Sequence, residues 1–456
     1  MTEWIAGINN QLNAVVWGPP MIVLLIGTGL LLTVMTRGIQ FRKLPFAFRE
    51  VLGDLSRWRS GEGTVRPFQA LATALASTVG VGNIAGVSTA VAAGGPGAVF
   101  WLILSGLFGM VTKFAEIAIA LHYRERDAAG IMRGGAMYVL KKGLGSGWMG
   151  AAFALLTGIA GFGIGNMVQA NSVADAMRTS FGVAPWITGA FLAALTALVV
   201  LGGIRRIAEV TQFLVPIMCL LYLGGCLVIT LRFAAQLPIV LQLILESAFT
   251  GQAAMGGFAG ATVKAALLNG FKRGLFSNEA GLGSAPIVHA SAVTDHPVRQ
   301  ASYGIVEVFV DTMVVCVMTG VVVLATGAWT SGDTGAALSA RAFSIGLPGQ
   351  WGHYAVSLSL VAFAFSTVVG WSYYGETAVT YLFGGRIVLP YRVAWTAVVY
   401  VGAVGSLQLV WSVADTLNGL MAIPNLIGVL GSVGLLLRLI REFFSRNLAA
   451  RGSPGG

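Results

Sequence analysis

The sequence predicts an all-α protein that crosses a membrane about eleven times. Composition is the first observation: 56% of the 456 residues are hydrophobic and 10% are charged, against about 25% charged residues in soluble proteins. The second is a series of long apolar runs separated by short basic segments. The third is glycine, with 62 residues, about twice its usual share. These observations exclude a soluble domain, and they exclude nucleic-acid binding as the meaning of the net charge of +10.

A transmembrane helix needs about 20 mostly apolar residues. The N-terminus lacks the basic and cleavage signals of a signal peptide, so we expect the first apolar run to be a retained span. Pro238–Phe249 is too short to cross and is expected to lie along the outer face. The predicted spans are Val15–Met35, Phe68–Ala93, Ala98–Leu121, Trp148–Met177, Trp186–Leu201, Ala208–Leu231, a broken segment around 256–292, Ile305–Thr326, Tyr354–Phe383, Val393–Val410 and Val413–Leu437.

The basic residues predict the orientation of these spans. With the N-terminus outside, all but four of the 28 Lys and Arg fall on the cytoplasmic side, as the positive-inside rule requires. A wrong number of spans would mix the two sets, because every later loop would change side. We therefore expect a multi-pass protein of the inner (cytoplasmic) membrane, with its N-terminus outside and its C-terminus in the cytoplasm. The four residues on the outer side are Arg178, Arg232, Lys264 and Arg341.

Two predicted spans carry glycine and small polar residues at membrane depth, where freed backbone groups need partners. In the second span Thr78 is followed by Gly80, Gly82 and Asn83, and the seventh contains the polar, glycine-rich segment 276–283. With the first span set aside, these are the first and sixth of ten helices, so they correspond in two inverted halves. Paired interrupted helices mark the binding site of a secondary transporter. The alternative is that the glycines serve only close helix packing.

At these residues the sequence resembles the sodium:alanine (alanine or glycine:cation) symporter family. The resemblance covers nearly the whole chain. One departure is that Leu102 and Ile103 follow Trp101, where the family usually has Met-Trp. The motifs that carry the resemblance are Arg273–Pro286 followed by His289 and Ala290, Thr78–Gly86, Gly94–Trp101, Thr112–Glu116, Gly165–Asn171 and Phe365–Glu376.

The resemblance implies the five-plus-five inverted-repeat fold of neurotransmitter:sodium symporters and amino-acid transporters, plus one extra N-terminal helix. It also implies uptake of a small neutral amino acid, alanine or glycine, driven by sodium or, in some relatives, another cation. The expected organisation is a peripheral N-terminal span (1–36), a basic cytoplasmic loop (37–66), a first repeat (67–232), a second repeat (233–437) that begins with an external segment (233–255), and a cytoplasmic tail (438–456).

The expected substrate contacts surround the two breaks. If the second span unwinds at Thr78–Gly82, a half-helix restarts near Asn83, and its unpaired N–H groups suit a carboxylate. Trp371 would cap the pocket and limit the size of the side chain. Simple packing is the alternative for Trp371 and Phe276, and interhelical hydrogen bonding is the alternative for Gln169. The predicted substrate contacts are Thr78, Gly80, Gly82, Asn83, Gln169, Phe276 and Trp371.

A sodium site is expected by analogy with the fold. Sodium prefers oxygen ligands, and Ser366 and Thr367 supply two hydroxyls in the middle of the ninth span. The carbonyl oxygens of Ala76, Val79 and Phe363 would complete the site. The alternative is that both hydroxyls bond only to their own helix.

Charged residues inside the predicted spans are functional candidates. Lys113 and Glu116 are three residues apart on one helix face, which predicts an ion pair or a gate latch. Glu279 is expected to hold the unwound backbone or to face Lys272 or Arg273. We expect structural or gating roles for Lys113, Glu116, Glu279, Glu307 and Asp311.

The sequence therefore predicts a sodium-coupled symporter that works by alternating access, with co-transported sodium as its cofactor. Its partners are expected to be a small neutral amino acid and the lipid bilayer, with no nucleic acid. A proton-coupled transporter with Glu279 or Asp311 as the proton carrier is the alternative. An ion channel lacks support, because the sequence has no selectivity-filter repeat. An enzyme is not expected, because no catalytic motif is present.

Overall fold

The structure is a computed structural model and describes residues 2–54, 61–250, 262–405 and 408–452. Within these residues eight helices are long and apolar enough to span a membrane, and a bent helix pair gives a ninth. Two further predicted spans, 186–201 and 256–292, fall on helices shorter than this limit. The number eleven therefore stays a prediction. Parts of the predicted segments 37–66, 233–255, 256–292, 393–410 and 438–456 lie outside the described residues.

The described chain is helical almost throughout. Its first elements are α1 (Thr2–Val16), α2 (Pro19–Met35), α3 (Ile39–Arg42) and α4 (Leu44–Asp54). The region predicted as the first repeat holds α5 (Pro67–Thr78), η1 (Gly82–Gly86), α6 (Val87–Gly94), α7 (Gly97–His122), β1 (Glu125–Arg126), β2 (Met132–Arg133), α8 (Ala136–Tyr138), η2 (Val139–Gly143), α9 (Gly147–Ala160), η3 (Gly161–Met167), α10 (Val168–Phe181), α11 (Pro185–Val200) and α12 (Gly203–Arg232).

The region predicted as the second repeat ends in α22, a helix that begins at Val433 and continues through the described part of the predicted tail. Its elements are η4 (Ala234–Gln236), α13 (Leu237–Thr250), α14 (Val263–Asn278), α15 (Ala285–His289), α16 (Pro297–Val308), η5 (Phe309–Cys316), α17 (Val317–Ala325), η6 (Ala328–Thr330), α18 (Gly335–Gly346), α19 (Trp351–Phe383), η7 (Gly385–Ile387), α20 (Val388–Val404), α21 (Gln408–Gly431) and the C-terminal α22 (Val433–Gly452).

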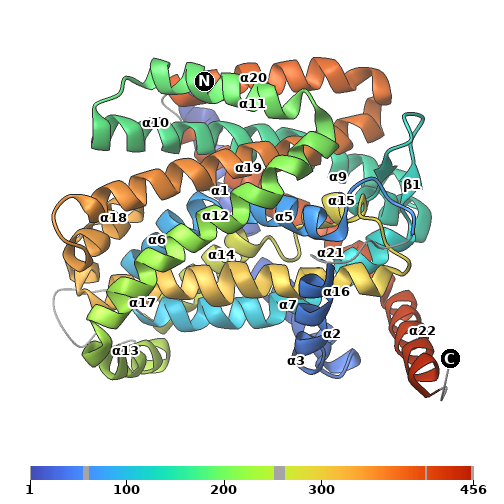
Figure 1. Cartoon of the computed structure of the whole chain (residues 1–456), viewed down its shortest axis with the longest axis horizontal. Helices are drawn as coiled ribbons and strands as arrows, with labels where there is room; N and C mark the ends of the chain where they lie inside the picture. The colour runs from blue at the N-terminus through green and yellow to red at the C-terminus, as the bar shows by residue number, and fades with distance from the viewer. Residues whose placement is uncertain (1, 55–60, 251–261, 406–407, 453–456) are drawn as a thin grey trace.

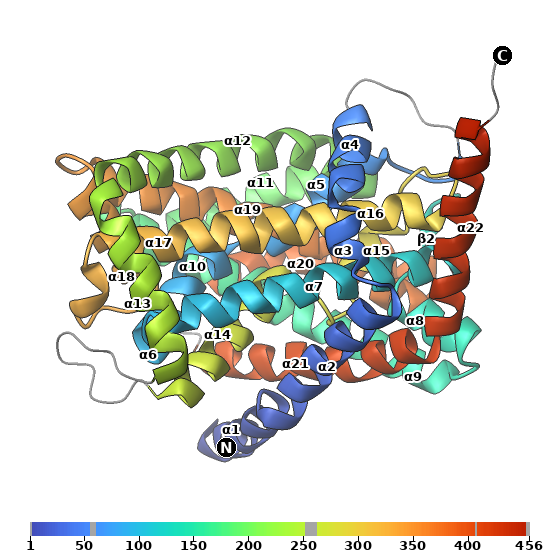
Figure 2. The same cartoon turned by 90° about the horizontal axis from the view of Figure 1, so that it is seen from below.

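The long helices lie side by side and run between two ends of the molecule (Figures 1 and 2). At one end, on the left in both views, α13 and α18 cover the helix termini; we call this the α18 end. At the other end lie α22 and the hairpin in which β1 pairs antiparallel with β2, Glu125 opposite Arg133; we call this the hairpin end. Apolar side chains of the long helices are buried in one large core between the two ends.

Helices α7 and α14 approach each other closely because α14 carries glycine where they meet. A Cβ added at Gly270 would lie 2.4 Å from the carbonyl oxygen of Ala98, and one added at Gly274 would overlap the Ser105 hydroxyl. Small residues at such contacts let two helix backbones pack tightly in a membrane. This contact holds α14, the helix that leads into the second break, against a straight neighbour.

We expect Gly270→Val to destabilise the protein by about 1–3 kcal/mol or more, because the new side chain overpacks the α7–α14 contact. Gly224 of α12 is the matched control, because a Cβ added there meets nothing within 4 Å. Gly224→Val is expected to change the stability by less than about 1 kcal/mol. Thermal unfolding of the two variants, followed by tryptophan fluorescence, checks the difference. Equal melting temperatures would contradict the packing described.

Candidate functional site

The first break lies where the sequence predicts it. Helix α5 ends at Thr78, and the chain resumes at Gly82 with a bend of 51°. The freed N–H of Gly80 donates to the side-chain oxygen of Asn83 (2.9 Å). Glycine is needed at position 80, since a Cβ there would lie 2.6 Å from the hydroxyl of Thr367 in α19. The break is therefore pressed directly against the hydroxyl-bearing part of α19.

The second break separates α14 from α15. Helix α14 ends at Asn278, whose side-chain oxygen accepts a hydrogen bond from the N–H of Ala280 (2.9 Å). Three residues then adopt positive φ: Glu279 (54°), Gly281 (95°) and Gly283 (76°). Two glycines relieve the strain that this conformation imposes on other residues. Glu279 adopts the same positive φ although it carries a Cβ atom.

A small cavity of about 20 Å³ lies between the two breaks. Six of the seven predicted substrate contacts line it; the exception is Asn83. The side chain of Asn83 instead joins Gly80 to Asp311, donating to the carboxylate of Asp311 at 2.6 Å. The lining consists of Ser77, Thr78, Gly80, Gly82, Ile164, Gln169, Phe276, Glu279, Thr367, Trp371 and Asn418.

Five cavity residues were not predicted as substrate contacts: Ser77, Ile164, Glu279, Asn418 and Thr367, the last of which was predicted as a sodium ligand. For Ser77 and Asn418 the sequence carries a usable signal, because each is a polar residue within an apolar run. Glu279 was predicted only as a structural or gating charge. Ile164 gives no signal, since one apolar residue in an apolar span resembles any other.

Trp371 forms one wall of the cavity and is fully buried. Its indole N–H donates to one carboxylate oxygen of Glu279 (2.9 Å), and the Ser284 hydroxyl donates to the other (2.5 Å). Gly165 makes room for the indole, since a Cβ there would lie 2.4 Å from the Trp371 side chain. The wall is therefore fixed from both sides, by a hydrogen bond and by close packing.

Four of the five predicted sodium ligands lie together beside the cavity. The Ser366 hydroxyl is 2.8 Å from the carbonyl oxygen of Phe363 and 3.2 Å from that of Ala76. The Thr367 hydroxyl is 3.0 Å and 3.1 Å from the same two oxygens. All four residues are buried. Val79, the fifth, is buried directly after α5 and donates its N–H to the carbonyl of Leu75.

The expected pairing of Lys113 with Glu116 is wrong. Lys113 of α7 forms a buried ion pair with Glu307 of α16 (3.1 Å), and the other oxygen of Glu307 contacts His289 (3.0 Å). Glu116 accepts a hydrogen bond from Asn425 of α21. A spacing of three residues places two side chains on one face of a helix, but the helices that pack against that face decide their partners.

The expected contact of Glu279 with Lys272 or Arg273 is also absent from the described residues. Lys272 pairs with Asp415 of α21 (2.9 Å). The guanidinium of Arg273 lies over the ring of Phe276, 5.7 Å from its centre. Neither basic side chain therefore pairs with Glu279 in the described residues, and Glu279 lines the cavity.

Asp311 does not line the cavity, but it connects the two breaks. Its carboxylate accepts hydrogen bonds from Asn83, which follows the first break, and from Ser277 of α14 (3.0 Å). Thr312 donates to the same carboxylate (2.8 Å). A displacement of either broken helix would therefore change the hydrogen bonds of the other, because both contact the Asp311 carboxylate.

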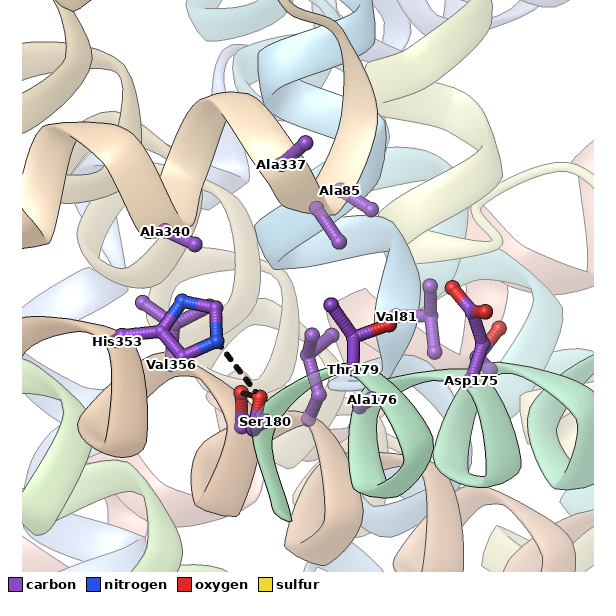
Figure 3. Close-up of a pocket in the computed structure, with 14 residues that line it drawn as sticks. Val81, Ala85, Asp175, Ala176, Thr179, Ser180, Ala337, Ala340, His353 and Val356 are labelled. Carbon is purple, nitrogen blue, oxygen red and sulfur yellow. Dashed lines mark hydrogen bonds between the residues drawn. The ribbon is translucent and has the colours of Figure 1, made fainter. Parts of the chain in front are cut away.

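A larger cavity of about 280 Å³ lies between the first break and the α18 end (Figure 3). Val81 in the break forms part of its wall, and His353 of α19 bonds to Ser180 of α10 (2.9 Å). Asp175 and Thr179 of α10 also face it. We call this space the vestibule. It extends from the first break toward the α18 end.

Polar contacts connect the elements at the hairpin end. Arg124 donates to the carbonyls of Glu62, Ala290 and Ala292, which brings together the segments next to both broken helices. Arg133 pairs with Asp127 at 2.6 Å. Partial burial raises the pKa of Asp127, but hydrogen bonds from Arg133 and from backbone N–H groups outweigh it and hold this pKa below its usual value.

The comparisons with known proteins agree with this geometry. Residues 2–453 match the model of the sodium:alanine symporter family. The chain belongs to the sodium:alanine symporter family. It is 47% identical to the sodium/alanine symporter AgcS of Methanococcus maripaludis, over 95% of this chain and 96% of that one. It is 36% identical to the probable sodium/glutamine symporter GlnT of Bacillus subtilis, over 98% and 92%.

Among solved structures the chain is similar to MhsT in complex with L-phenylalanine. The TM-score is 0.55 at 15% identity, and the match covers 80% of this chain and 89% of that one. At this identity the likeness shows the fold alone. The fold class predicted from the sequence is thereby confirmed for this member of the sodium:alanine symporter family.

We expect Glu307→Gln to destabilise the protein strongly, by about 3–5 kcal/mol, because it leaves Lys113 as a buried charge without its partner. Glu116→Gln is the matched control: it keeps the hydrogen-bonding atoms of a buried carboxyl group that is not paired with Lys113. Thermal unfolding of both variants measures the difference. A larger loss of stability in Glu116→Gln than in Glu307→Gln would contradict this result and support the pairing of Lys113 with Glu116.

Proposed function

We propose that the protein takes up a small neutral amino acid, alanine or glycine, together with sodium. The observation that carries this proposal is the shared position of Thr367. Its hydroxyl belongs to the cluster of four oxygens, and the same residue lines the central cavity. A cation held by the oxygens and a substrate in the cavity would therefore touch one side chain.

The groups that line the cavity suit an amino acid with a small side chain. The walls must move apart to admit it, because about 20 Å³ holds about one water molecule. The half-helix begins at Gly82, which lines the cavity, so the positive end of its dipole lies there and favours a carboxylate. Trp371, Phe276 and Gln169 occupy the space that a larger side chain would need. AgcS, a relative of 47% identity, is a sodium/alanine symporter by name.

The oxygen cluster suits a hard monovalent cation. It offers two carbonyl and two hydroxyl oxygens and no carboxylate, and hard cations prefer oxygen ligands. Ala76 belongs to the first broken helix, whereas the other three residues belong to α19. A bound sodium ion would thus hold the broken helix against α19 in the arrangement that forms the cavity.

Transport would proceed by alternating access. In the arrangement described, the vestibule extends toward the α18 end, and polar contacts connect the elements at the hairpin end. The basic residues favour the hairpin end as the cytoplasmic side of the inner membrane. Rocking of the helix bundle would then open the hairpin end and release both ligands inside.

Uptake of labelled alanine into proteoliposomes tests this proposal. We expect accumulation when sodium is higher outside, and none when choline replaces sodium. Glycine is expected to compete. Uptake that follows a pH gradient in the absence of sodium would contradict sodium coupling and replace it with proton coupling.

Thr367→Val tests the sodium site, because it removes one cation ligand and keeps the shape of the side chain. We expect the sodium concentration that gives half-maximal uptake to rise about tenfold or more, since hydrogen-bond-like contacts to charged groups contribute about 1.5–3 kcal/mol. Thr380→Val is the control: Thr380 lies farther along α19 and bonds to the carbonyl of Glu376. An unchanged sodium requirement in Thr367→Val would reject this site.

A further inference from the structure

Among the described residues that line the central cavity, Glu279 is the only one with an ionisable side chain. It is 4% exposed, so water does not compensate its charge. A carboxylate transferred from water into such surroundings is costly unless a positive charge or strong hydrogen bonds accompany it. An ionised Glu279 would therefore need a positively charged partner in the cavity.

The described residues supply only neutral partners to Glu279. One oxygen accepts from the Trp371 indole and the other from the Ser284 hydroxyl. Lys272 pairs with Asp415 and Lys113 with Glu307. The Arg273 guanidinium lies over the ring of Phe276, 5.7 Å from its centre, and makes no ion pair with Glu279 among the described residues. A carboxylate has about four acceptor positions. Two of them therefore remain for a cationic group in the cavity.

The backbone at Glu279 is held in a conformation that residues with a Cβ rarely adopt. Its φ is 54°, in the left-handed region, directly after the end of α14. Such a conformation costs free energy and persists where the surrounding structure enforces it. Here it turns the carboxylate into the cavity, toward Trp371. The backbone conformation of Glu279 is an observation separate from its lack of a basic partner. Both observations indicate that the carboxylate contacts a ligand in the cavity.

The cavity is therefore polarised along one direction. At one wall lies the positive end of the half-helix that begins at Gly82, and at another lies the Glu279 carboxylate. A zwitterion of zero net charge fits this arrangement with its carboxylate at the half-helix. We propose that Glu279 binds the ammonium group of the transported amino acid. This assignment rests on the proposed function, and it makes Glu279 part of the substrate site.

This subsite explains selectivity for amino acids over other small acids. An α-hydroxy acid such as lactate has the size and the carboxylate of alanine, but it brings a second negative charge beside Glu279 without an ammonium group. A buried charge left without its partner is strongly unfavourable. The protein should therefore bind alanine far more tightly than lactate.

The test compares alanine with lactate in the purified full-length protein at saturating sodium. Binding of labelled alanine and its competition by lactate are measured for the wild type, Glu279→Gln and Glu116→Gln. Gln keeps an acceptor for Trp371 and removes only the charge. In Glu279→Gln we expect alanine affinity to fall about tenfold or more, and the ratio of alanine to lactate affinity to fall as well. Glu116→Gln should keep the wild-type ratio.

Two results would overturn the assignment while alanine still binds the wild type. One is an alanine affinity in Glu279→Gln within threefold of the wild type. The other is unchanged discrimination against lactate, with larger amino acids newly accepted; Glu279 would then act only by positioning Trp371. A sodium affinity in the absence of alanine that matches the wild type shows that the variant is folded. Failure of the wild type to bind alanine would instead contradict the proposed function.

Discussion

The hydrocarbon interior of a membrane offers no hydrogen-bond partner to a peptide group, so a break in a spanning helix must be satisfied by the protein itself or by a ligand. Both breaks here use a nearby amide side chain. Asn83 accepts from the N–H of Gly80, and Asn278 accepts from the N–H of Ala280. At the end of α5 the carbonyl of Ala76 contacts the hydroxyls of α19. The oxygen cluster and the central cavity, which we assign to sodium and to the amino acid, lie beside these breaks.

Buried charge imposes a second constraint on the same region. Lys113 and Glu307 neutralise each other, with His289 on the second oxygen of Glu307. Asp311 and Glu279 accept only from neutral donors among the described residues. Charged residues in a membrane are retained where they serve transport or hold a structure together. The paired charges stabilise the helix contacts, whereas Glu279 remains available to a ligand that carries its own positive charge.

Sequence reasoning located both breaks, because glycine and small polar residues at membrane depth depart sharply from an apolar background. It also grouped Ala76 with Ser366 and Thr367, but only through the family resemblance. The sequence did not predict the correct ion-pair and hydrogen-bond partners of the buried charged side chains. Helical periodicity places Lys113 and Glu116 on one face, yet the partner of Lys113 depends on how α16 is rotated against α7. The same limit explains why the inward turn of Glu279 was not predicted, since it follows from a positive φ at a non-glycine residue.

Coupling between the two ligands is tested most directly by equilibrium binding to the purified protein. Linkage requires that sodium and alanine raise each other's affinity by the same factor, commonly about 5- to 150-fold for coupled sites. A shared contact at Thr367 predicts a factor in this range: the alanine dissociation constant falls as sodium is raised, and the sodium dissociation constant falls equally as alanine is raised. An alanine affinity that is the same in sodium and in choline would contradict the sodium-coupled site.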